Sequence, residues 1–252
     1  MINCDVILNI CKIAGEAIME VYNSDEFDVE SKDDQSPITK ADIIANKIIS
    51  DELSKNYPDI PIISEESMNE DFTIREKWKT CFIVDPIDGT KEFIKKNGEF
   101  TVNIALIENG YPVEGFIYAP ALEVFYFTKN GISFKRSKLH TQKLPISKPT
   151  NFTFVTSRSH LDNQTQSYID ELKKKHQSLK ILPVGSSLKF CMIAEGSADE
   201  YTRFSSIMEW DTAAAQAIVE NSGGKFIDIE SNKKPVYNKN TLKTNAFKVS
   251  RT

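Results

Sequence analysis

The sequence lacks the features that mark a secreted, disulfide-stabilised or membrane-spanning chain. It contains only four cysteines in 252 residues, and no two of them have CxxC spacing. Three of the four are in apolar runs, so we expect buried, reduced thiols. No apolar run approaches the roughly 20 residues of a membrane span. Charged residues interrupt the first apolar stretch too early for a signal peptide, so we expect a cytoplasmic protein.

The sequence has no excess of positive charge either. It has 31 Lys and Arg residues against 36 Asp and Glu residues, which gives a formal net charge of −5. A nucleic-acid polymer usually demands a basic stripe, so this charge argues against such a partner. It does not argue against a small phosphate ester, because bound metal ions can supply positive charge locally.

The pattern of apolar residues predicts an α/β fold. Residues 3–22 and 39–56 have apolar side chains at three- and four-residue spacing, which is typical of amphipathic helices. Short apolar runs and two Asn-Gly turns then predict a largely antiparallel sheet over residues 61–135. From residue 152 onward strands alternate with helices, which indicates an α/β arrangement.

The rhythm of these elements changes near residues 145–150, where two prolines occur. The composition, 40% hydrophobic and 27% charged, is that of an ordinary globular protein, and the length suffices for one large domain or two modest ones that share a core. We therefore predict an N-terminal α+β lobe with a metal site over residues 1–148. A C-terminal α/β lobe with substrate-binding residues is predicted over residues 149–252. Together the lobes form alternating layers of helices and sheets.

Two aspartates directly follow an apolar strand in the motif DPIDGT, where Asp85 and Asp88 are three positions apart. Pro86 fixes the backbone between them, and Gly89 permits a close approach to a ligand. The helical turn that begins at Thr90 offers free N–H groups to a phosphate. Carboxylates beside an anion site make sense if they hold hard cations such as magnesium. The alternative is that Asp-Gly is an ordinary turn and that the first aspartate only ends a strand.

Two other acidic positions share this character. Glu65 and Glu66 directly follow a short apolar strand, and Asp211 begins a predicted long helix. Taken alone, Asp211 would be interpreted as a plain helix N-cap. Three acidic strand or helix ends together favour a shared metal site.

These motifs resemble those of a known enzyme family. DPIDGT at residues 85–90 and Trp210-Asp211 resemble the paired signatures of the inositol monophosphatase superfamily of metal-dependent, lithium-sensitive phosphatases, and the similarity extends over essentially the whole chain. The segments that resemble one branch, the 3'(2'),5'-bisphosphate nucleotidases of sulfate assimilation (CysQ type), are KEFI at 91–94, NGEFTVN at 97–103, SRSH at 157–160 and GSSLKF at 185–190. The resemblance implies the inositol monophosphatase-like sugar phosphatase fold. It also implies hydrolysis of adenosine 3',5'-bisphosphate, also called 3'-phosphoadenosine 5'-phosphate (PAP), to AMP and phosphate.

The resemblance assigns metal-binding roles to the acidic residues. It implies two to three magnesium ions per active site. The ligand set would be Glu65, Asp85, the carbonyl of Ile87, Asp88 and Asp211. Asp85 would bridge two of the ions, which together would clamp the attacking water and the leaving oxygen.

Asp42 and Thr90 match the pair that orients the attacking water and removes its proton in this family. Asp42 also has a structural interpretation, because Thr39-Lys40-Ala41-Asp42 reads as a capping box at the start of the second helix. The two roles are compatible with each other.

The same resemblance implies a set of residues that contact the substrate. Ser187, Lys189 and Arg203 would grip the non-reacting phosphate and the ribose, and His160 would lie near the nucleotide. The alternative for the two cations is an ordinary solvated surface position. Glu209 is predicted to lie at the surface. The complete substrate-binding set is Glu65, Ile87, Asp88, Gly89, Thr90, His160, Ser187, Lys189, Arg203 and Asp211.

Two other functions use the same features. One is an inositol monophosphatase or another small sugar-phosphate phosphatase with the same metal site. The other is a non-catalytic metabolite or metal sensor, which would be expected to have lost a catalytic carboxylate, and none is lost. The resemblance favours a monomer. Some bacterial relatives are peripheral on the inner membrane face, but the sequence has no amphipathic anchor or basic patch that would explain such attachment.

Overall fold

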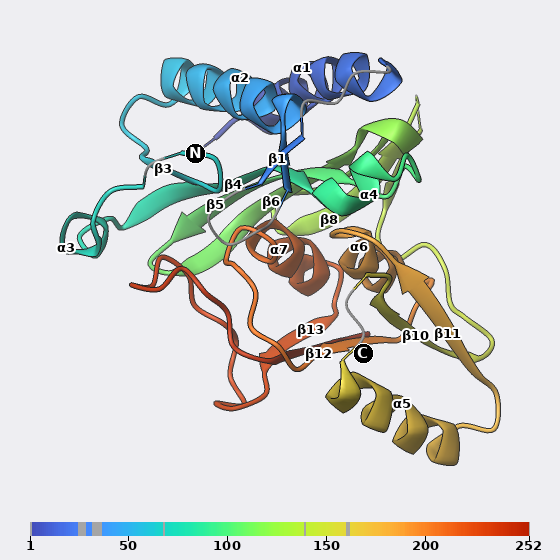
Figure 1. The fold of residues 1–252 in the computed structure, drawn as a ribbon. Coiled ribbons are helices and arrows are strands. Elements are labelled where there is room, and N and C mark those ends of the chain that lie inside the picture. The colour runs from blue at the N-terminus through green and yellow to red at the C-terminus, as the bar shows by residue number, and fades with distance from the viewer. Residues whose placement is uncertain are drawn as a thin grey trace.

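A computed structural model of the chain describes residues 2–24, 29–31, 37–67, 69–138, 140–159 and 162–251. These residues form alternating layers of helices and sheets (Figure 1), so the predicted fold class is confirmed. The division into lobes at residues 148 and 149 stays a prediction. None of the helices in the described ranges is long and apolar enough to cross a membrane.

The larger sheet has seven strands in the order β3-β4-β5-β6-β7-β8-β9. All neighbouring pairs are antiparallel except β3 and β4, which are parallel. The Asn-Gly pairs after β5 and β7 have positive φ at both residues, as tight hairpin turns require, which confirms the two predicted hairpins. The strands are β3 (Ile62–Ser64), β4 (Thr80–Asp88), β5 (Thr101–Glu108), β6 (Tyr111–Ala119), β7 (Val124–Lys129), β8 (Ile132–Ser137) and β9 (His140–Lys143).

Two long helices, α1 (Cys4–Asn23) and α2 (Lys40–Asn56), cover one face of this sheet (Figure 1). Asn3 caps α1 by accepting a hydrogen bond from the Asp5 amide at 3.0 Å, which satisfies one of the free N–H groups of the first turn. Apolar residues of both helices pack against the outward side chains of β5, such as Val102 and Ile104. The alternate residues of the same strand face the other side, so the strand is buried on both faces.

Helices α6 (Leu188–Glu195) and α7 (Ala213–Asn221) lie between the two sheets (Figure 1). Helix α7 approaches β6 very closely, because a Cβ atom added at Gly115 would lie 2.2 Å from the Ala214 carbonyl oxygen. The glycine and the alanines of α7 therefore allow the backbones of helix and strand to touch.

The second sheet has five strands in the order β11-β10-β12-β14-β13, and α5 (Asn163–Lys175) packs on its outer face. Strand β10 is parallel to β11 and β12, whereas β14 is antiparallel to both of its neighbours. The strands are β10 (Phe152–Ser157), β11 (Leu179–Val184), β12 (Glu200–Arg203), β13 (Lys225–Asp228) and β14 (Phe247–Ser250). The remaining elements are β1 (Val29–Ser31) paired with β2 (Pro37–Thr39), α3 (Phe72–Arg75), α4 (Thr90–Ile94) and the 3-10 helix η1 (Pro120–Leu122).

The structure differs from the sequence-based expectation at several elements. Strand β12 was not predicted, because charged residues at both of its ends make the segment look like a loop. Its pairing with β10 and β14 stabilises the extended conformation. Helix α7 begins at Ala213 rather than at Asp211, whose side chain is turned into the site described below. Short α3 and the edge strand β9 were also missed. The prediction of four buried free thiols is confirmed.

Candidate active site

Asp85 and Asp88 both face one pocket, although a regular strand would place residues three apart on opposite faces. The pairing of β4 with β5 runs without interruption to Asp85, opposite Asn103, and resumes at Asp88, opposite Thr101. Three steps on β4 therefore match two steps on β5, which is a one-residue bulge. The bulge redirects the second carboxylate to the side of the first.

Asp211 joins these two aspartates from the turn before α7. Carboxylate oxygens of Asp85, Asp88 and Asp211 lie within 4.8 Å of one another. The Asp211 side chain is oriented by the Met208 amide, which donates a hydrogen bond to its Oδ2 at 3.0 Å. Among the described residues, the buried Oδ1 of Asp85 has no hydrogen-bond partner. Three clustered carboxylates and an unpaired buried oxygen are the donor set that a hard divalent cation requires.

The cluster is electrostatically unfavourable without a cation. Burial raises the pKa of the Asp85 carboxyl well above its ordinary value, and the neighbouring charges of Glu65, Asp88 and Asp211 raise it further. Burial also raises the pKa of Asp211, and repulsion from Asp88 and Glu65 adds to it. The pKa of Asp88 is raised by burial as well. A bound cation would relieve the repulsion that these raised pKa values report.

Glu65 and Ile87 complete the predicted ligand set at the same pocket, which has a volume of about 260 Å³. Glu65 directly follows β3, and its amide donates a hydrogen bond to the Val84 carbonyl at 3.2 Å. Parallel pairing of β3 with β4 thus places the ends of the two strands side by side. The five predicted metal ligands all line this pocket.

Asp42 and Thr90 meet at the edge of the site. One carboxylate oxygen of Asp42 accepts hydrogen bonds from the Thr39 amide and hydroxyl, at 2.7 and 2.6 Å, so the capping-box interpretation is confirmed. The other oxygen lies 3.5 Å from Thr90 Oγ1, which is also 3.3 Å from the Ile87 carbonyl oxygen. Asp42 therefore both caps α2 and contacts the threonine predicted to act with it.

The predicted substrate residues fall into three groups. Lys189 and Arg203 line the pocket with Gly89, and Lys189 Nζ donates to the Ser186 carbonyl at 2.5 Å. Ser187 is fully buried and does not line the pocket; its hydroxyl contacts Asp88 instead. The geometry therefore does not favour the predicted contact between Ser187 and substrate. His160 lies outside the described residues.

Asn103 is a site residue that the sequence reasoning missed. Its side-chain amide lies 2.9 Å from Ser187 Oγ, which lies 2.7 Å from Asp88 Oδ2 and 3.2 Å from the Asp211 carbonyl oxygen. The serine hydroxyl thus joins β5, β4 and the turn before α7. The signal in the sequence was a lone amide in the otherwise apolar, buried stretch of residues 102–107.

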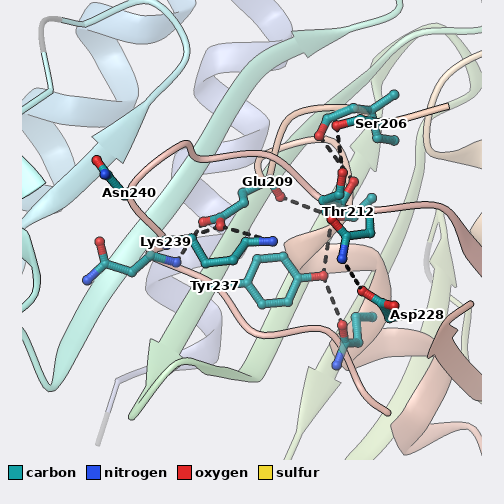
Figure 2. A network of polar contacts seen from close by, with 12 residues as sticks. Ser206, Glu209, Thr212, Asp228, Tyr237, Lys239 and Asn240 are labelled. Carbon is teal, nitrogen blue, oxygen red and sulfur yellow. Dashed lines mark hydrogen bonds and ion pairs between the residues drawn. The ribbon is translucent and has the colours of Figure 1, made fainter. Parts of the chain in front are cut away.

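The prediction that Glu209 lies at the surface is wrong, because its side chain is fully buried. Its carboxylate accepts hydrogen bonds from the backbone amides of Asn238 and Lys239, at 2.6 and 3.2 Å, and lies 3.7 Å from Lys239 Nζ (Figure 2). Burial raises the pKa of this carboxyl to about 7, although these partners oppose the shift. The carboxylate thus anchors the 238–239 loop next to the turn that carries Asp211.

The sequence and the fold of this chain have counterparts among known proteins. The model of the inositol monophosphatase family matches residues 4–250. The chain belongs to this family. The 3'(2'),5'-bisphosphate nucleotidase CysQ of Buchnera aphidicola is 46% identical over 223 residues, which are 88% of this chain and 82% of that protein. The protein of the same name from Escherichia coli K12 is 43% identical and covers 89% of both chains.

A solved structure supports the same assignment. The crystal structure of CysQ from Bacteroides thetaiotaomicron, a bacterial member of the inositol monophosphatase family, superimposes with a TM-score of 0.87 at 38% identity, covering 98% of this chain and 96% of that one. Enzymes of the inositol monophosphatase family depend on metal ions, and the buried acidic cluster of this chain agrees with that dependence.

Proposed function

We propose that this protein is a magnesium-dependent 3'(2'),5'-bisphosphate nucleotidase that hydrolyses PAP to AMP and phosphate in sulfate assimilation. The observation that carries the proposal is the convergence of Asp85, Asp88 and Asp211 in a pocket that Lys189 and Arg203 also line. The carboxylates suit metal ions that bind a phosphate, and the basic side chains suit the remaining negative charge of a ligand with more than one phosphate. Relatives at 43 and 46% identity with the nucleotidase name support the substrate class.

We assign two to three magnesium ions to the carboxylates of Glu65, Asp85, Asp88 and Asp211 and to the carbonyl of Ile87. When bound, the ions supply the positive charge that offsets the charge developing on the phosphoryl oxygens. The chain itself holds the carboxylates in place: Ser187 orients Asp88, and the Met208 amide orients Asp211. These fixed positions avoid reorganisation during the reaction.

The water that attacks phosphorus needs orientation and a proton acceptor. Thr90 Oγ1 lies between Asp42 and the Ile87 carbonyl, at 3.5 and 3.3 Å, so its hydroxyl is positioned from two sides. We assign Thr90 the orientation of the water and Asp42 the acceptance of the proton through that hydroxyl. The second oxygen of Asp42 is engaged by Thr39, which fixes the carboxylate on the first turn of α2.

Lys189 and Arg203 are the groups we assign to the second phosphate and the ribose. Both line the pocket beside the acidic cluster, and each can supply positive charge to a phosphate. The Arg203 guanidinium also acts on Asp211, where it opposes the rise in that carboxyl's pKa. The side chain lines the same pocket as Asp211, so we place it within reach of a substrate bound there.

Phosphate release from PAP, with and without magnesium and beside inositol 1-phosphate, tests the proposal. We expect fast release from the nucleotide that requires magnesium, and slow release from the inositol ester. Release from the inositol ester alone would keep the metal chemistry and replace the substrate assignment. No release from either compound, in a folded protein saturated with magnesium, would overturn the proposed function.

A further inference from the structure

The segment that joins α4 to β5 carries Glu99, which contacts the C-terminal half of the chain beside the pocket. The Glu99 carboxylate pairs with the Arg158 guanidinium through two parallel bonds, from Nε to Oε2 and from Nη2 to Oε1, each 2.7 Å long. Such bidentate pairs fix orientation as well as distance. The side chain of Glu99 is 23% exposed and that of Arg158 is 40% exposed, so the pair is only partly screened by water.

Glu99 holds a second loop at the same time. Its Oε2 accepts a hydrogen bond of 2.7 Å from the Gly185 amide, just after β11. Arg158 reinforces this contact, because its Nη2 donates to the Pro183 carbonyl at 2.7 Å. We call Glu99, Arg158 and Gly185 the Glu99 cluster. It ties two loops, one after β10 and one after β11, to the segment that follows α4.

The contact is tight as well as polar. A Cβ atom added at Gly185 would lie 2.6 Å from Glu92 Cγ and 2.9 Å from the Glu99 carbonyl oxygen, so only glycine allows this approach. Glu92 makes a parallel contact, since its Oε1 accepts a hydrogen bond of 2.6 Å from Ser159 Oγ. The Glu99 carboxylate therefore binds both loops, and the Glu92 carboxylate of α4 adds a second contact to the loop after β10.

These loops form a wall of the pocket. Ser157, Gly185 and Ser186 line it together with the predicted metal ligands. Lys189 is held by the same loop, because its Nζ contacts the carbonyls of Ser186 and Val184. The position of the Lys189 ammonium thus depends on where the Glu99 cluster holds residues 183–186. The aspartates of the metal site are held by β4, by the Met208 amide and by Ser187, which follows the loop as the N-cap of α6.

We propose that Glu99 is a positioning residue for substrate specificity, which acts by fixing the 183–186 loop and, through it, Lys189. The proposal rests on the proposed nucleotidase function. Glu99 does not contact the metal ligands through any hydrogen bond found in the described part of the chain. Its loss should therefore weaken binding of a substrate that reaches the wall, and should spare a small ester that needs only the metal site.

The test compares Glu99→Ala with a matched control, Glu220→Ala. Glu220 is 20% exposed and pairs with Lys234 at 2.7 Å near the end of α7, and it does not line the pocket. We expect Glu99→Ala to raise KM for PAP about tenfold, as the loss of a charge-assisted hydrogen-bond pair implies. We expect kcat/KM for p-nitrophenyl phosphate to stay within about twofold, and Glu220→Ala to leave both substrates unchanged.

Additional variants separate positioning from general destabilisation. Arg158→Ala should reproduce the effect of Glu99→Ala, and the double variant should be no worse than either single one. Glu99→Gln keeps an acceptor for the Gly185 amide and should fall between Glu99→Ala and the parent protein. Equal losses on both substrates, or an unchanged KM for PAP in Glu99→Ala, would overturn the proposal.

Hydrogen exchange at the Gly185 amide keeps this test independent of the proposed function. If the parent protein releases phosphate from neither substrate, the nucleotidase assignment fails by itself. The cluster is then judged by exchange, which should be about tenfold faster in Glu99→Ala than in Glu220→Ala or the parent. An unchanged exchange rate would show that Glu99 does not hold the loop.

Discussion

Replacing Asp85 by asparagine should stabilise the metal-free protein while removing its activity. Asp85 is 1% exposed, its Oδ1 has no partner among the described residues, and its charge faces those of Asp88 and Asp211. Two unit charges 4.8 Å apart repel by about 3.5 kcal/mol at an effective dielectric constant of about 20. Because the pKa of the carboxyl is raised, partial protonation already relieves part of this repulsion in the parent protein. We therefore expect Asp85→Asn to gain about 2 kcal/mol of unfolding free energy when no metal is bound.

Thermal unfolding in EDTA and in magnesium measures this effect. A gain of about 2 kcal/mol corresponds to a rise in Tm of about 4–8 °C for a chain of this size. The parent protein should be further stabilised by magnesium, and Asp85→Asn should lose most of that response because an anionic ligand is missing. Phosphate release should fall to background.

Asp51→Asn is the control, since Asp51 is an exposed carboxylate on α2 that pairs only with Lys47 in the contacts of the described residues. It should change neither the Tm in EDTA nor the response to magnesium. A lower Tm for Asp85→Asn than for the parent in EDTA would refute the idea of a strained acidic cluster. An undiminished magnesium response would refute the assignment of Asp85 as a ligand.

Three further predictions concern single positions. Asp88→Asn should fold, because Ser187 can still donate to the amide oxygen, but its kcat should fall about a hundredfold or more; near-normal turnover would contradict the metal role. Gly115→Ala should cost about 3 kcal/mol of unfolding free energy in denaturant titrations, because its Cβ would meet the backbone of α7; an unchanged midpoint would contradict the close packing. For Glu209, whose pKa is raised to about 7, the protonated form favours folding: that contribution is complete below the ordinary value of 4.5 and is lost as the pH rises through about 7. Melting curves should therefore show that Glu209→Gln loses less stability than the parent as the pH rises from about 5 to about 8. Equal slopes of Tm against pH in the two proteins would argue against a buried carboxyl.

Much of the fold follows from local patterns. The helices over residues 4–23 and 40–56 follow from three- and four-residue spacing of apolar side chains, and the two Asn-Gly hairpins follow from backbone conformations that few other residues adopt. Strand β12 was missed because it has only four residues and begins and ends with a charged one; its pairing with β10 and β14 stabilises the extended conformation.

The acidic site was predictable for a similar reason. Each of Glu65, Asp85, Asp88 and Asp211 has an ordinary interpretation at the end of a strand or helix, but together these acidic ends favoured a shared metal site. Their convergence depends on long-range pairing, however. The β4 bulge brings Asp85 and Asp88 to one side, and the approach of α7 to β6 brings Asp211 to them.

The role of a polar side chain was harder to predict than its presence. Glu209 was predicted at the surface because the sequence around it gives no sign of its partners. These partners, the amides of residues 238 and 239, lie about 30 positions further along the chain. Ser187 looked like a substrate contact, yet it points to Asp88 and Asn103. Such assignments require knowledge of which side of a turn faces the pocket.

The sequence by itself determined the long helices, most of the strands, the hairpin turns and the identity of the acidic residues, because each depends on neighbours a few positions away. Only the tertiary structure decided which carboxylates meet in one pocket, which serine orients one of them, and that Glu99 binds the loops near residues 158 and 185. The contacts of Glu99 and Ser187 join positions 59 to 99 residues apart in the chain. Chain segments so distant meet only when the sheets and helices have packed, so no local pattern encodes their pairing.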